Sequence, residues 1–175
     1  MNLTAAALIS QVISFVVFIT AAAWYVAPWM KRRPLGQALP ALLWVQAFRG
    51  VAMQIFSARK FGFAITVGLA RQIAWGDVAG AVLALACLWL LRHRSRWARP
   101  LLWVFVAETV IDLANATVQG IHQMAFTTAS SVTWVILNFY APLLWVTIVL
   151  IAWRLSRGAT ETAVPQARSG AGSPT

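Results

Sequence analysis

The stretch VFVAETVIDLANATVQGIHQ, residues 104–123, has the length of a membrane-spanning helix but carries six polar side chains. A helix needs about 20 residues to cross the hydrocarbon core of a bilayer. At about 100° per residue, the six side chains lie within an arc of about 100° and form one polar face. That face must turn toward protein or a cavity, because an ionised side chain at the centre of a membrane helix costs roughly 2.5–3.5 kcal/mol. The six residues are Glu108, Asp112, Asn115, Gln119, His122 and Gln123.

The composition of the whole chain is that of a membrane protein. Of its 175 residues, 61% are apolar and 10% are charged, whereas soluble domains have about 45–50% and about 25%. The net charge is +10, but the basic residues occur in short clusters between apolar runs, which is typical of topology signals. We therefore expect a membrane bundle surrounded by lipid, with no nucleic-acid partner.

Five segments are long and apolar enough to span a membrane. They are residues 3–30, 39–56, 72–91, 101–123 and 131–153. Residues 57–71 have an apolar centre too short to span, so we expect a loop or a re-entrant interfacial piece there. The sequence thus predicts an all-α transmembrane helical bundle over residues 1–157. Residues 158–175 are small, polar and rich in Gly and Pro, and we expect a disordered cytoplasmic tail.

Basic residues near the ends of the spans predict the orientation of the bundle. With five spans, the clusters at residues 31–33, 92–99 and 154–168 fall on one side, with Arg59, Lys60 and Arg71 on the other. This bias predicts an N-terminus outside and a C-terminus in the cytoplasm. Four spans would divide the clusters between both sides.

Arg49 is the expected partner of the acids at 104–123. It lies ten residues into its predicted span, and Asp112 lies eleven residues into its own. At 1.5 Å per residue, both side chains sit about 15–17 Å deep. The sequence therefore predicts that spans two and four face each other, with Arg49 between Glu108 and Asp112. Since two acids share one cation, we expect Glu108 to be protonated at neutral pH.

Further polar and aromatic residues are candidates for the same pocket. Asp77 is expected near the outer end of its span, where it could reach His122 and Gln123. No nucleotide, metal or nucleophile motif occurs, and Cys87 is the only cysteine, so we expect no cofactor and no metal. The predicted ligand-binding residues are Arg49, Gln46, Glu108, Asp112, Asn115, Gln119, Trp134 and Asn138.

Three functions fit this pattern. The first is binding or transport of a small lipophilic molecule, with Arg49 and Asp112 holding its polar head and Glu108 coupling occupancy to protonation. The second is an intramembrane enzyme, such as an isomerase of a lipophilic substrate, with Glu108 and Asp112 as acid and base. The third is an accessory subunit of a larger membrane complex or homo-oligomer, with the polar face against a partner helix. The polar network could instead only hold the bundle together.

Two adjacent stretches, GDVAGAVLALACLWLLR at 76–92 and LLWVFVAETVIDLANATVQG at 101–120, resemble a group of small uncharacterised bacterial multi-pass membrane proteins. In that group a Gly-Asp pair opens one span, and a Trp, an Asp and an Asn-Ala pair recur in the next. The matching positions here are Gly76, Asp77, Trp103, Asp112, Asn115 and Ala116. The resemblance implies a bacterial inner-membrane setting and transfers no activity.

Overall fold

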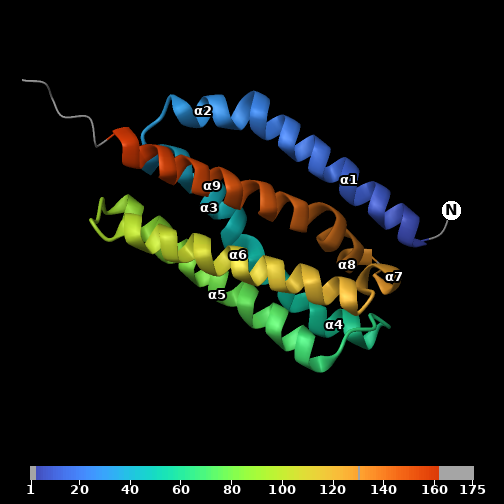
Figure 1. Cartoon of the computed structure of the whole chain (residues 1–175). Helices are drawn as coiled ribbons and strands as arrows, with labels where there is room; N and C mark the ends of the chain where they lie inside the picture. The colour runs from blue at the N-terminus through green and yellow to red at the C-terminus, as the bar shows by residue number, and fades with distance from the viewer. Residues whose placement is uncertain (1–2, 130, 162–175) are drawn as a thin grey trace, which may run out of the picture.

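The computed structural model describes residues 3–129 and 131–161, and it contains only helices and short connections in these ranges (Figure 1). Five of the described helical segments are long and apolar enough to cross a membrane, which agrees with the number predicted. These segments are Thr4–Lys31, Leu35–Lys60, Val67–Arg92, Ala98–His122 and Ser131–Arg157.

Three of the five membrane-length segments consist of several shorter helices. The first contains α1 (Leu3–Ala21), the π-helix η1 (Ala22–Val26) and α2 (Ala27–Lys31). The second contains α3 (Leu35–Ala47), the 3₁₀-helix η2 (Phe48–Gln54) and α4 (Ile55–Lys60). The third and fourth are α5 (Val67–Arg92) and α6 (Ala98–His122), and the short α7 (Ala125–Thr128) follows. The fifth contains α8 (Ser131–Val135), the π-helix η3 (Ile136–Tyr140) and α9 (Ala141–Glu161).

Both π-helices end two residues before a proline. In η1, the backbone N–H of Ala27 donates to the carbonyl of Ala22, and the next residue is Pro28. The π-helix η3 ends in the same way before Pro142. Proline has no N–H to continue the helical ladder, and a π-turn is one way for a helix to accommodate that loss.

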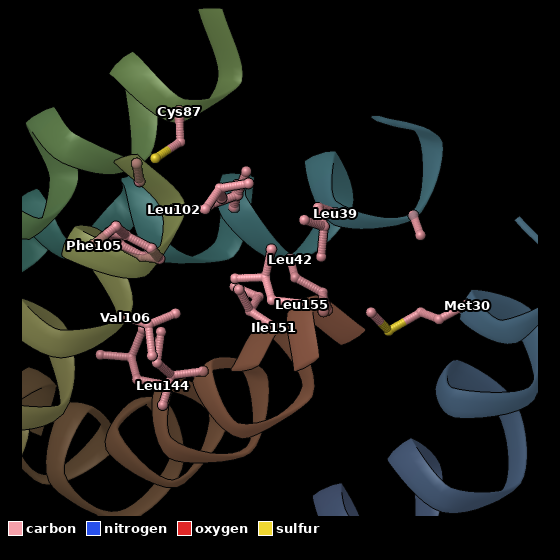
Figure 2. Close-up of a cluster of buried hydrophobic side chains, with 14 of the residues drawn as sticks. Met30, Leu39, Leu42, Cys87, Leu102, Phe105, Val106, Leu144, Ile151 and Leu155 are labelled. Carbon is pink, nitrogen blue, oxygen red and sulfur yellow. The ribbon is translucent and has the colours of Figure 1, made fainter. Parts of the chain in front are cut away.

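The helix α5 lies at the centre of the polar part of the bundle. The helix α5 packs against α3, η2 and α6. The helix α9 contacts α1, α3 and α6, while α1 lies outermost beside α9 (Figure 1). Figure 2 shows the apolar core that joins α3, α5, α6 and α9, where Leu39, Phe105, Ile151 and Leu155 are fully buried.

Two predicted boundaries were wrong. The loop expected at 57–71 is confined to residues 61–66, because α4 continues to Lys60 and α5 begins at Val67. The side chain of Thr66 caps α5 by accepting a hydrogen bond from the Leu69 N–H at 3.2 Å. At the C-terminus, residues 158–161 continue α9 instead of starting a disordered tail, and residues 162–175 lie outside the described ranges.

The bundle gathers the described members of the three predicted basic clusters at one end. Arg154 Nη2 donates to the carbonyl of Arg33 at 2.9 Å, and Arg99 Nη2 donates to the carbonyl of Leu155 at 3.5 Å. The ends of α2, α6 and α9 therefore meet, as a bundle of five antiparallel spans requires. Which side of a membrane this end faces stays a prediction.

Candidate functional site

Arg49 is the largest fully buried side chain among the described residues and lies near the start of η2. Its Nε donates to Asp77 Oδ1 at 2.6 Å, and its Nη2 donates to Asp112 Oδ2. Its Nη1 donates to Thr109 Oγ1 at 3.3 Å. The guanidinium group thus joins η2, α5 and α6. Removing one partner from such a buried pair would leave an uncompensated charge, which costs about 3–5 kcal/mol.

The prediction for Arg49 was correct for one acid and wrong for the other. Asp112 binds Arg49, as their matched depths indicated, but the second carboxylate is Asp77 instead of Glu108. Glu108 Oε2 accepts a hydrogen bond from the Thr109 hydroxyl at 3.2 Å and is only half-buried. Because α5 begins at Val67, five residues before the predicted start, Asp77 lies well inside the helix and at the depth of Arg49.

The expected neighbours of Asp77 are bonded elsewhere. Gln123 pairs with Thr66, since its Oε1 accepts from the Thr66 N–H at 3.0 Å and its Nε2 donates to Thr66 Oγ1 at 3.2 Å. His122 is exposed at the end of α6. The predicted contact of Asp77 with these two residues is therefore wrong.

The facing of spans two and four was also only partly correct. The second span packs mainly against α5 and α9, not against α6. Arg49 reaches Asp112 because its side chain is long and α5 offers it little obstruction. At this depth, the contact between spans two and four is therefore made by side chains.

Two glycines on α5 make room for the charged groups. A methyl group at Gly80 would overlap Arg49 Nη1 and come within 3.0 Å of Arg49 Cζ. A methyl group at Gly76 would overlap Asp112 Oδ1 and come within 2.6 Å of its Cγ. This role was not predicted, although GDVAG at 76–80 has the G-x-x-x-G spacing that brings membrane helices close together.

An apolar cavity of about 170 Å³ lies beside the two aspartates. Asp77 and Asp112 form part of its wall, whereas Arg49 does not line it. The cavity is bounded by α1, η2, α5, α6 and the segments from α8 to α9. Most of its other lining residues are apolar or aromatic, including Phe15, Ile55, Phe63, Leu69, Ile73, Leu113, Ala116, Ile136, Leu137, Tyr140 and Trp145.

Of the eight predicted ligand-binding residues, only Asp112 lines this cavity. Gln46 is buried elsewhere, and its Nε2 donates to Thr147 Oγ1 at 2.9 Å and to the Leu144 carbonyl at 3.1 Å. It therefore joins α3 to α9. A link between helices cannot be distinguished from a ligand contact by sequence, since both need a polar side chain facing inward.

The remaining predicted residues lie around the cavity but not on its wall. Asn138 is buried in η3, where its Nδ2 donates to the Trp134 carbonyl at 2.9 Å. Trp134 packs against a second apolar cluster. This cluster lies at the end of the bundle opposite the basic clusters. Asn115 and Gln119 are partly buried on α6.

An open apolar groove runs between the first span and α9 and meets the cavity. The groove has a volume of about 470 Å³, and every residue on its wall is apolar or aromatic. Phe15 and Trp145 line both the groove and the cavity. These two side chains therefore stand between the cavity and the outer surface of the bundle.

The fold and the site define a class of protein: a membrane-type bundle of five long helices with a buried Asp–Arg–Asp group beside an apolar cavity. The described residues contain no group of three or more His, Cys, Asp or Glu side chains arranged to hold a metal ion. The chain belongs to the family described as Domain of unknown function (DUF8737), whose family model matches residues 6–156. No curated protein and no solved structure matches the chain.

Proposed function

We propose that this protein binds a small, largely apolar molecule in the cavity beside Asp77 and Asp112, within a bacterial inner membrane. The observation that carries the proposal is that two carboxylates fixed by Arg49 also line an apolar space. The volume of about 170 Å³ resembles that of an engineered cavity of about 150 Å³ that binds benzene. A ligand with one ring or a short chain, and a polar head at the aspartates, would fill it.

A purely structural role accounts less well for this arrangement. Polar contacts between membrane helices contribute about 0.6 kcal/mol each on average. Well-packed apolar residues often replace a buried ion pair with no loss of stability. A chain that needed only cohesion would not require three charged groups at one depth, two of them open to a cavity.

The groove between the first span and α9 supports a lipophilic ligand. In a bilayer this groove would face the hydrocarbon, because the first span has the smallest buried share of the five. A molecule dissolved in the bilayer would reach the cavity by passing Phe15 and Trp145. Transport would use the same cavity and would appear as flux of the bound molecule into proteoliposomes.

Filling the cavity tests this proposal directly. Ala116 lines the cavity, and Ala107 lies exposed on the same helix, α6. We expect the wild-type protein and Ala107→Leu to bind 2-phenylethanol or 2-phenylethylamine, measured by calorimetry in neutral detergent micelles. Ala116→Leu adds three carbon atoms to the cavity wall and should abolish saturable binding. Binding by Ala116→Leu equal to that by Ala107→Leu would refute the proposed site.

A further inference from the structure

We infer that the cavity selects molecules with a cationic amine head over molecules with a neutral or anionic head. This inference rests on the proposed function and names the chemical class of the ligand. The polar head was expected to be held by Arg49 together with Asp112. The structure places Arg49 behind the aspartates, so that the ligand would contact the carboxylates and not the guanidinium group.

The hydrogen bonds of Arg49 show why it is not open to a ligand. All three of its nitrogens donate to protein acceptors, and the residue has no exposed surface. Arg49 uses one oxygen of each aspartate, Oδ1 of Asp77 and Oδ2 of Asp112. Within the described chain, the second oxygen of each aspartate accepts no hydrogen bond. The aspartates thus keep acceptor capacity, although Asp112 Oδ1 lies against Gly76, and Arg49 presents no donor at the cavity wall.

The balance of charge points to the same ligand class. The two ionised aspartates and the guanidinium group together carry one excess negative charge. The third carboxyl group nearby, that of Glu108, supplies no positive charge to balance it. Among the described residues that line the cavity there is no Lys, Arg or His. An ammonium head would compensate the excess charge and donate hydrogen bonds to the free oxygens. A carboxylate head would meet two carboxylates without an accessible cation.

The aromatic side chains of the cavity favour a cation as well. Phe15, Phe63, Tyr140 and Trp145 line the wall that also holds Asp77. A cation near an aromatic face is attracted by the negative potential of the ring, most strongly where water is excluded. The neutral polar residues of the wall, Gln11, Gln54, Thr117 and Thr133, carry no charge that would oppose this preference.

The experiment compares three probes of similar size, each a phenyl ring with a two-carbon chain: 2-phenylethylamine, 2-phenylethanol and phenylacetate. Binding to the wild-type protein is measured by calorimetry in neutral detergent, so that the micelle itself does not select by charge. We expect the amine to bind at least about tenfold more tightly than the alcohol, the difference expected from an ion pair with cation–π support. Phenylacetate should show no saturable binding.

Two variants on adjacent turns of α6 test which carboxylate is responsible. Asp112→Asn removes a carboxylate from the cavity wall, whereas Glu108→Gln removes one that does not line it. Asp112→Asn should reduce the preference for the amine over the alcohol, and Glu108→Gln should leave it unchanged. Circular dichroism checks that both variants fold, and the comparison of probes on the wild-type protein requires neither of them.

The outcomes separate this inference from the proposed function. Equal binding of amine and alcohol, both abolished by Ala116→Leu, would overturn the amine preference and leave the binding site standing. Tighter binding of phenylacetate would overturn the charge argument in the same way. No saturable binding of any of the three probes would overturn both. Preferential binding of the amine, lost in Ala116→Leu, would support both.

Discussion

Replacing Gly80 by alanine should destabilise the bundle by displacing Arg49. The new methyl group would overlap Nη1 and lie 3.0 Å from Cζ, whereas ordinary contacts begin at 3.4 Å. The guanidinium group would therefore have to move by at least about 0.4 Å at Cζ (3.4 minus 3.0 Å), and further at Nη1. The bond from Nη1 to Thr109 Oγ1 is already 3.3 Å long and would break first.

The magnitude follows from two opposing effects. A hydrogen bond to a charged group contributes about 1.5–3 kcal/mol, and an alanine gains at most about 1 kcal/mol over glycine within a helix. Gly80→Ala should therefore lower the free energy of unfolding by about 0.5–2 kcal/mol. Gly68→Ala is the matched control on the same helix, since a methyl group there meets nothing within 4 Å. It should be neutral or slightly stabilising.

The assay is titration with sodium dodecyl sulfate in mixed micelles, followed by circular dichroism. A double-mutant cycle isolates the contact, because Gly80→Ala should lose its penalty in an Arg49→Met background. If Gly80→Ala is as stable as Gly68→Ala, the guanidinium group can move without loss. Arg49 would then not need a glycine at position 80.

Three further results are expected. Arg49→Gln should lower the free energy of unfolding by about 3–5 kcal/mol. Adding Asp77→Asn and Asp112→Asn should restore most of that stability in the same titration. No recovery would mean that Arg49 does not compensate the two carboxylates. Phe15→Ala should raise both the association and dissociation rates of 2-phenylethylamine in stopped-flow measurements, and unchanged rates would indicate another path into the cavity. Amine affinity should fall as the pH is lowered, because protonation of an aspartate removes the negative charge that the ammonium needs. This dependence should persist in Glu108→Gln, and its loss there would instead give Glu108 the coupling role predicted from the sequence.

The helical spans could be predicted because the length and hydropathy of a segment follow directly from the order of its residues. The basic clusters at 31–33 and 92–99 fall on one side only if an even number of spans separates them, and the ends of the spans do meet as that requires. The depth of a residue in the membrane likewise depends only on its position along its own helix. For that reason Arg49 and Asp112 could be paired before their helices were placed.

The partner at Asp77 could not be predicted because its depth depends on where α5 begins. The sequence places Val67 to Arg71 in a loop or an interfacial piece, because the apolar stretch at 61–70 is too short to span a membrane. In the structure, Thr66 caps a helix that already begins at Val67, and Arg71 is exposed at the helix surface. A shift of five residues moves a side chain by about 7.5 Å along a helix at 1.5 Å per residue. That distance separates an interfacial position from the depth of Arg49.

The cavity depends on information that no single helix contains. Its wall draws on segments from the first to the fifth span, and its connection to the groove depends on how Phe15 meets Trp145. Hydrophobic periodicity assigns both residues to helices, but it does not say whether two helices close against each other or leave space. The same limit explains the role of Arg49: depth predicted its bond to Asp112, whereas only packing shows that the carboxylates, and not the guanidinium group, face the cavity. The sign of the charge presented to a ligand is therefore a property of the assembled bundle, and it is opposite to the sign suggested by Arg49 alone.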